Sequence, residues 1–210
     1  MRPQDMELGV VFAERRRDVR IIVNIAGRFS LSSRLNARDD RRVFACRAVN
    51  LSPQAVALAT VIIGEPGDRV TAHIDHLGKL QGTLMRVLER GFVMNISATD
   101  AERERLIDKI EWVEKHKNHD VSDKRANERF VPTNPYSRMI LADGSCEDCL
   151  VLDISVSGAA VSANTVPNIG TLLAIGTVIG RVVRHFEGGF AVQFIQPQDR
   201  DAVEALVIRE

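Results

Sequence analysis

The chain has 210 residues, a length that accommodates one large domain or two domains of about 100 residues each. Apolar residues make up 45% of the sequence and charged residues 27%, which is typical of globular proteins with substantial hydrophobic cores. The formal net charge is zero, which argues against binding of nucleic acid or of a membrane surface through bulk charge.

The N-terminal apolar run, residues 8–13, is too short for a signal peptide and is flanked by Glu7 and Glu14. No other stretch approaches the length needed to span a membrane. The three cysteines are sparsely placed and odd in number, which favours a reducing compartment over a disulfide framework. We therefore expect a cytoplasmic protein.

The first half of the chain reads as an arginine pair followed by β-strands. Arg16 and Arg20 are four positions apart, and the segments after them are rich in Val, Ile and Thr and separated by turn residues. The expected strands lie within residues 20–31, 43–52, 55–63, 69–76, 80–89 and 91–97.

A helix is expected over residues 98–116, after these strands. Thr99 and Glu102 have the spacing of a capping box, in which each side chain bonds to the other residue's backbone N–H. Leu106, Ile110 and Val113 form one apolar stripe that should pack on the strands. Trp112 is expected to pack against a barrel or between domains.

The second half repeats the same order after a polar linker. Arg125 and Arg129 have the spacing of the first pair, and a short helix at 198–210 is expected to pack through Val203, Leu206 and Val207. The expected strands lie within residues 137–144, 147–155, 158–163, 171–176, 178–186 and 188–195. We expect two domains, residues 1–119 and 120–210.

Six short strands per unit without intervening helices indicate an antiparallel barrel or sandwich. The units differ in one place, because 30 positions separate Arg20 from Asn50 and only 24 separate Arg129 from Asp153. The surplus is expected in a polar insertion over residues 32–42, which costs little because loop-closure entropy grows slowly with length.

A second motif follows each arginine pair. Asp153, Ser155 and Gly158 form D-x-S-x-x-G, and the first unit has the same pattern with Asn50, Ser52 and Ala55. Strand alternation predicts that Leu150, Leu152 and Ile154 point inward, which places Asp153 and Ser155 side by side on an accessible face.

These residue types suit a guanine nucleotide that carries more than one phosphate. Arginine pairs bidentately with phosphate oxygens or with the O6/N7 edge of guanine. A carboxylate or amide opposite could accept from the N1–H and N2–H₂ edge of guanine, and a serine hydroxyl could reach a phosphate.

The ordered pair of motifs, R-x-x-x-R and then D/N-x-S-x-x-G, resembles the PilZ domain, in two tandem copies at about 12–117 and 122–210. This resemblance implies two six-stranded antiparallel β-barrels, each followed by a C-terminal helix, and binding of cyclic di-GMP. The site residues it implies in the second unit are Arg125, Arg129, Asp153, Ser155 and Gly158. In the first unit it implies a possible second, weaker site from Arg16, Arg20, Asn50 and Ser52, because Ala55 replaces the glycine and Pro53 stiffens the turn.

We therefore expect a non-enzymatic cyclic di-GMP receptor that acts mainly through its C-terminal domain, in signalling that controls motility or exopolysaccharide and biofilm formation. No cofactor is expected, and no membrane or nucleic acid partner. The alternative is a nucleotide-independent protein–protein interaction module with degenerate barrels. A protein partner is expected in either case, but the sequence does not identify it.

Rival sites are weaker. Cys146 and Cys149 lack the second pair of ligands that zinc requires, and the odd spacing should send the two thiols to opposite faces of a strand. The histidine pairs His73/His76 and His116/His119 have helical spacing but fall in a strand and at a helix end. No nucleophile–base pair stands out, so catalysis is not expected.

Overall fold

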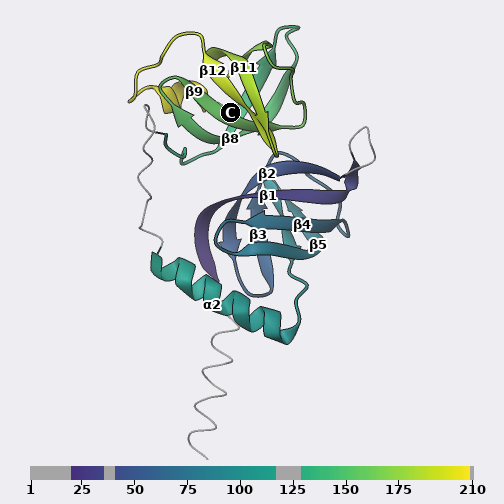
Figure 1. Cartoon of the computed structure of the whole chain (residues 1–210). Helices are drawn as coiled ribbons and strands as arrows, with labels where there is room; N and C mark the ends of the chain where they lie inside the picture. Colours follow the sequence, from purple (N-terminus) through teal and green to yellow (C-terminus); the bar gives the residue numbers. More distant parts are fainter. Residues whose placement is uncertain (1–19, 36–40, 117–128, 209–210) are drawn as a thin grey trace, which may run out of the picture.

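A computed structural model of the chain describes residues 20–35, 41–116 and 129–208. Within them the chain forms two closed antiparallel barrels of six strands each, coloured from purple to teal and from green to yellow in Figure 1. This confirms the predicted mainly β fold and decides between barrel and sandwich. Arg16, Arg125 and the expected domain boundary at 119/120 lie outside the described residues.

The barrels share one strand order. The N-terminal barrel is ordered β1-β2-β3-β6-β5-β4, and the C-terminal barrel is ordered β7-β8-β9-β12-β11-β10. The strands of the first are β1 (Ile21–Leu35), β2 (Arg41–Leu51), β3 (Ala55–Ala59), β4 (Arg69–Ile74), β5 (Gly78–Leu88) and β6 (Gly91–Asn95). The strands of the second are β7 (Tyr136–Leu141), β8 (Cys146–Ser155), β9 (Gly158–Ala163), β10 (Leu172–Ile175), β11 (Val178–Phe186) and β12 (Gly189–Phe194).

Each barrel encloses its own core. In the first, alternate residues of β4 point inward, and Val70, Ala72 and Ile74 are all buried. The Phe29 and Phe92 rings meet edge-on at 5.2 Å in the same core, a favourable aromatic geometry. The second core is built mainly from Val, Ile and Ala around Phe190, and it is separate from the first.

The insertion expected over 32–42 is partly strand rather than loop. Strand β1 has 15 residues, against six in its counterpart β7, and it pairs with β2 as far as Leu35 and Arg41. Ser32 and Ser33 are fixed by hydrogen bonds to the carboxylate of Asp68. The surplus residues therefore extend a hairpin, because the polar side chains find partners across the strands.

A β-bulge occurs at equivalent places in the two barrels. In β8, Val151 pairs with Val161 and Asp153 with Ala160, so Leu152 is the extra residue. In β2, Ala48 pairs with Leu58 and Asn50 with Ala57, which leaves Val49 in the same role. Each bulge therefore lies immediately before the first residue of the D/N-x-S-x-x-G motif.

Helix α2 (Asp100–His116) closes the N-terminal barrel. The predicted capping box is present: the Thr99 N–H donates to Glu102 Oε2 at 2.8 Å, and the Glu102 N–H donates to Thr99 Oγ1 at 3.4 Å. The predicted stripe packs on the barrel and includes Ile107 as well. The expected packing of Trp112 against a barrel is confirmed only in part. Its ring lies 5.6 Å from that of His76 in the β4–β5 turn and stacks on that of His116 at 4.5 Å, but 49% of the residue is exposed.

Helix α3 (Val203–Val207) is the short counterpart that packs on the C-terminal barrel. Val203 and Val207 are fully buried, and Leu206 is partly buried against the same core, as the sequence predicted. The helix also bonds to the barrel, since the Thr177 N–H donates to the carbonyl of Leu206 at 2.9 Å.

The barrels meet along a seam between β2 and the β8–β9 side of the second barrel. Figure 1 shows the β11–β12 hairpin of the second barrel reaching down to β2. At its tip, the Ala45 N–H donates to the Gly188 carbonyl at 3.2 Å, and Ser162 Oγ donates to the same carbonyl at 2.7 Å. Arg42 Nη2 donates to the Asn164 carbonyl at 2.6 Å.

None of the helices in the described residues is long and apolar enough to cross a membrane.

Candidate functional site

An isolated β-bridge brings the second arginine motif onto the second barrel. The Phe130 N–H donates to the Ile154 carbonyl, and the Ile154 N–H donates back to the Phe130 carbonyl, both at 2.9 Å. The Phe130 side chain packs against the barrel core, and the Arg200 guanidinium lies over its ring at 4.9 Å. Residues next to this bridge are therefore held against the Asp153 segment of β8.

Arg129 and Asp153 meet at this point. Arg129 Nη1 donates to Asp153 Oδ1 at 2.8 Å, although 24 positions separate the two residues. About a third of each side chain is exposed, 30% for Arg129 and 32% for Asp153. The pair is therefore preformed, and both groups remain reachable from solvent.

Ser155 lies in the same segment but faces inward to its own turn. It is only 3% exposed, and its hydroxyl is 3.3 Å from both the Gly158 carbonyl and Ser157 Oγ. The expectation that Asp153 and Ser155 share an accessible face is therefore wrong for the serine. The predicted alternation holds for Ile154, which faces the core, but Leu152 is the bulge residue, and Val151 faces the core in its place.

Gly158 is required for the packing of two strands, and its backbone conformation is ordinary. Its φ is outside the left-handed region, but a Cβ at this position would lie 2.4 Å from the Val192 carbonyl oxygen on β12. The absence of a side chain lets β9 and β12 approach closely. Gly158 is therefore needed for strand packing and not for a positive φ.

The first unit reproduces the same contacts with an amide in place of the carboxylate. Arg20 Nε donates to Asn50 Oδ1 at 2.8 Å. Ser52 Oγ donates to the carbonyl of Ala55 at 3.1 Å, as Ser155 does to that of Gly158. Ala55 has an ordinary φ and pairs with Asn95 on β6, so its methyl group is accommodated.

A shallow hollow of about 190 Å³ lies over this first-unit cluster, lined by Arg20, Asn50, Ser52 and, from the strands beside them, Met85 and Arg86. Helix α2 holds the turn beside this hollow, because Arg103 Nη1 donates to the carbonyl of Pro53, the residue after Ser52, at 2.6 Å. The first unit is therefore not degenerate in geometry, although it lacks the negative charge that Asp153 brings to the second.

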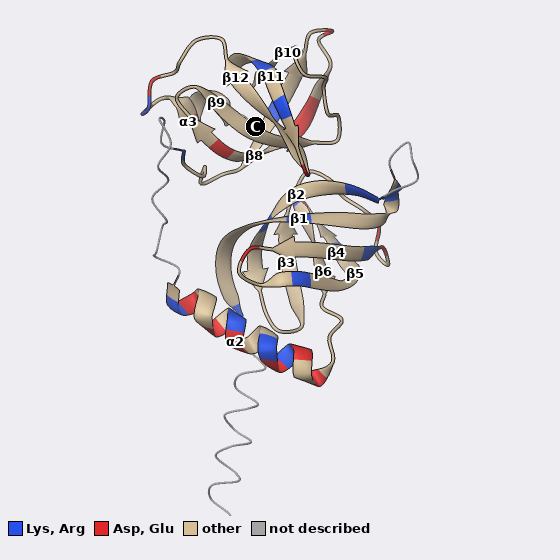
Figure 2. Ribbon diagram, in the orientation of Figure 1, with Lys and Arg blue, Asp and Glu red and all other residues tan. Residues whose placement is uncertain are grey.

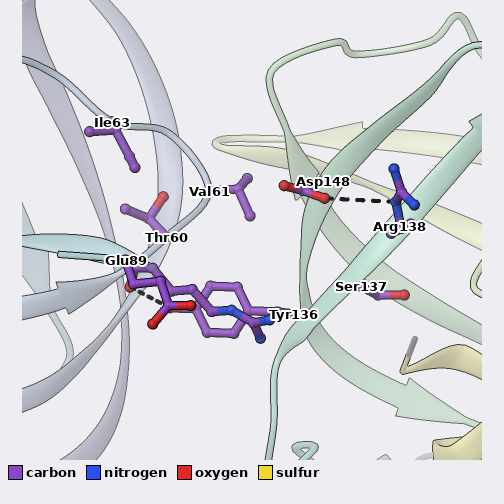
Figure 3. Close-up of a pocket in the computed structure, with 9 residues that line it drawn as sticks. Thr60, Val61, Ile63, Glu89, Tyr136, Ser137, Arg138 and Asp148 are labelled. Carbon is purple, nitrogen blue, oxygen red and sulfur yellow. Dashed lines mark hydrogen bonds and ion pairs between the residues drawn. The ribbon is translucent and has the colours of Figure 1, made fainter. Parts of the chain in front are cut away.

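A cavity of about 240 Å³ lies between the barrels (Figure 3). The figure shows Thr60, Val61 and Glu89 of the first barrel facing Tyr136 and Asp148 of the second. Tyr136 Oη donates to the Arg90 carbonyl at 2.7 Å, and the Arg90 guanidinium lies 4.8 Å from the ring centroid. Burial raises the pKa of Tyr136, and the positive charge of Arg90 acts in the opposite direction.

Sequence reasoning missed Arg47, which is 4% exposed on β2 beneath the Asp153 segment. Its Nη2 donates to the carbonyl of Leu152, the bulge residue of β8 in the other barrel. A signal was present in the sequence, because an arginine interrupts the otherwise apolar run 43–49 of an expected strand.

Within the described residues, no group of three or more His, Cys, Asp or Glu side chains could hold a metal ion; His119 lies outside these residues, so the His116/His119 pair is not tested. Cys149 is buried and Cys146 exposed, as the odd spacing predicted, and burial raises the pKa of Cys149 to about 12. Figure 2 shows Lys and Arg interspersed with Asp and Glu along α2, so the helix does not present a field of one sign.

Comparisons with known proteins identified solved structures that are similar to this chain. Three solved structures align over most of the chain at low similarity. They are PlzA of Borreliella burgdorferi in complex with c-di-GMP (10% identity, 96% of this chain, 97% of that one, TM-score 0.31), MotI/DgrA, an inhibitor of motility of Bacillus subtilis (11%, 89%, 94%, 0.30), and YcgR of Escherichia coli in complex with c-di-GMP (13%, 95%, 85%, 0.26). At such scores these likenesses carry no argument about function. The comparison with curated proteins gave no match.

A family model gives the more direct result. Residues 123–209 match the PilZ domain, and this range contains Arg129, Asp153 and the whole of the C-terminal barrel. The match covers the C-terminal barrel, and the N-terminal barrel, which lies outside the matched residues, has the same strand order.

Proposed function

We propose that the chain is a receptor for cyclic di-GMP and that the nucleotide binds mainly at the C-terminal barrel, over Arg129 and Asp153. The observation that carries this proposal is the preformed Arg129–Asp153 pair, held beside the bulge of β8 by the Phe130–Ile154 bridge. It lies within the residues that match the PilZ domain, and the resemblance to that domain implies this ligand.

The chemistry of the pair matches the ligand. The Asp153 carboxylate accepts from the N1–H and N2–H₂ edge of a guanine, and the Arg129 guanidinium pairs with a phosphate or with the guanine O6/N7 edge. Arg125, four positions before Arg129, is proposed to supply a second guanidinium. Ser155, being buried, is assigned to shaping the turn and Gly158 to strand packing.

The first barrel is proposed as a second, weaker site. Arg20, Asn50 and Ser52 adopt the same arrangement beneath a hollow, and Arg16 is the remaining member of that motif. An amide is neutral, so Asn50 would accept a weaker hydrogen bond from guanine than the Asp153 carboxylate does.

Nucleotide binding is proposed to act through conformation or partner choice rather than through catalysis. The site adjoins the seam, because Leu152 of the bulge contacts the first barrel through Arg47. A ligand that draws Arg129 and Asp153 onto itself would therefore bias the contact between the barrels. Motility and biofilm formation are the proposed outputs, in a cytoplasmic bacterial setting.

Titration calorimetry with cyclic di-GMP tests the proposal on the full chain. Arg129→Ala and Asp153→Asn each remove a charge-assisted contact, and each should weaken binding about 10- to 100-fold. Arg20→Ala should remove only a weaker second event. Arg184→Ala is the matched control, since Arg184 is exposed on β11, three strands away from β8 in the closed barrel.

The outcomes separate the two candidate functions. Equal heats for wild type and for both site variants would contradict the assignment of the site. Absence of binding by the wild type, together with a nucleotide-insensitive complex with another protein, would favour an interaction module with degenerate barrels.

A further inference from the structure

The C-terminal site is built on a backbone irregularity. Leu152 is the extra residue of the β8 bulge, and it is followed directly by Asp153. A bulge leaves one residue outside the regular ladder and redirects the side chains that follow it. Here it places Asp153 on the outer face of the barrel beside Arg129, so the position of the carboxylate depends on the bulge.

A side chain of the N-terminal barrel donates a hydrogen bond to the β8 bulge. Arg47 Nη2, from β2, donates to the Leu152 carbonyl, and Arg47 Nη1 donates to Asn24 Oδ1 on β1 at 3.3 Å. The guanidinium is thus anchored in the N-terminal barrel and bonded to the C-terminal one. Arg47 occupies the position in β2 that Leu150 occupies in β8, three residues before the motif in each case.

A buried arginine at this position is not explained by stability. Its Nε is buried and is the one such side-chain nitrogen or oxygen atom within the described residues for which no hydrogen bond is found. Burial lowers the pKa of the guanidinium, and the negative charge of Asp153 acts in the opposite direction. Buried charges of this kind add little to folding and are often replaceable by apolar side chains of similar size.

We propose that Arg47 is a positioning residue for the nucleotide site of the neighbouring barrel: it holds the Leu152 carbonyl and thereby sets the place of Asp153. This inference rests on the proposed function of that site. It makes the N-terminal barrel part of the site without requiring that Arg47 touch the ligand.

The test compares three full-length variants with the wild type by calorimetric titration with cyclic di-GMP. Arg47→Met removes the donor at similar volume and should weaken binding by about tenfold or more, since an unpaired carbonyl lets the bulge rearrange. Arg47→Lys keeps a cationic donor and should recover most of the affinity. Arg28→Met is the matched control, because Arg28 crosses the same seam to Glu187 at 3.0 Å without contacting the bulge.

A second readout follows the conformation without ligand. The amide resonances of Leu152 and Asp153 in ¹H–¹⁵N spectra should move in Arg47→Met, return toward the wild type in Arg47→Lys, and stay in place in Arg28→Met. Thermal unfolding of the same samples checks that each variant is folded.

The results distinguish this inference from the proposed function. If the wild type binds and Arg47→Met binds equally well with unmoved resonances, Arg47 has no positioning role and the assignment of the site survives. If Arg47→Met and Arg28→Met lose affinity alike, the seam matters only as a whole and the inference is overturned. If the wild type does not bind the nucleotide, the proposed function falls, and this inference with it.

Discussion

At the residue scale, Gly158 has a different role from the one its motif suggests. Its missing side chain accommodates the Val192 carbonyl of β12, while in the other barrel the equivalent Ala55 is tolerated. The two positions therefore impose different packing demands even though they occupy the same place in the motif.

A substitution at Gly158 tests this difference. Gly158→Ala places a methyl group 2.4 Å from the Val192 carbonyl oxygen, so the strands must separate. The free energy of unfolding should therefore fall by about 1–3 kcal/mol. At the equivalent position of the first barrel, Ala55→Gly should lower the free energy of unfolding by no more than about 1 kcal/mol. Urea denaturation followed by circular dichroism measures both, and equal losses would show that the glycine is not there for packing.

The sequence predicted that Arg129 and Asp153, and likewise Arg20 and Asn50, belong to one site, and the structure brings each pair into contact. It did not predict the burial of Ser155 or the role of Arg47. Strand alternation assumes a regular ladder, whereas the bulges at Val49 and Leu152 depend on pairing with a neighbouring strand. The contact of Arg47 depends on docking of two domains, which local patterns do not encode.

At the element scale, local signals were reliable where the interaction is local. The capping box of α2 was readable because Thr99 and Glu102 are three residues apart. The strand segments were readable from their Val, Ile and Thr content and from the turn residues between them. The ends of the polar stretch 32–42 are strand rather than loop, because Ser32 and Ser33 bond to Asp68, which is 36 positions from Ser32. The expectation for Trp112 was right only in part, since the ring contacts His76 of the barrel but 49% of the residue stays exposed.

The capping box predicts a pH dependence of stability. Hydrogen bonds from the Thr99 backbone and hydroxyl hold the pKa of Glu102 below its ordinary value. A depressed pKa in the folded state stabilises the protein above the ordinary glutamate pKa of about 4.3, and this contribution is lost as pH falls through the lowered value.

Thermal unfolding should therefore show Glu102→Gln below the wild type in melting temperature at neutral pH, with the gap closing in acid. Glu104→Gln, an exposed change outside the box on the same helix, is the control and should show no such convergence. A gap that stays constant from neutral pH to acid would contradict the role given to the carboxylate.

At the scale of the whole molecule, the β11–β12 hairpin fastens the barrels together. Gly188 has φ +93°, and a Cβ there would lie 2.8 Å from the Ala45 nitrogen of the first barrel. Glycine is thus needed twice, for its backbone conformation and for the close approach of β2. Even a methyl group at this position should therefore disturb the contact between the barrels.

Gly188→Ala should loosen the docking of the barrels while leaving each one folded. Gly144→Ala is matched to it, because Gly144 also has a positive φ, +82°, but a Cβ there would have nothing within 4 Å. Each variant bears the cost of a left-handed backbone, about 1–2 kcal/mol, and only Gly188→Ala adds the clash. Small-angle scattering should give a larger radius of gyration for Gly188→Ala alone; identical radii would contradict the fastening role.

Three hydrogen bonds across the seam are accepted by main-chain carbonyls of the C-terminal barrel. Leu152, Asn164 and Gly188 each offer a main-chain carbonyl, and the first barrel supplies the donors from Arg47, Arg42 and Ala45. A carbonyl is common to every amino acid, so these three contacts depend on the path of the backbone and not on which side chains the C-terminal barrel carries there. A chimera that receives a foreign barrel with the same bulge and the same glycine-tipped hairpin should keep these three hydrogen bonds, and it would have to supply counterparts of Glu187 and Tyr136 to keep the side-chain contacts.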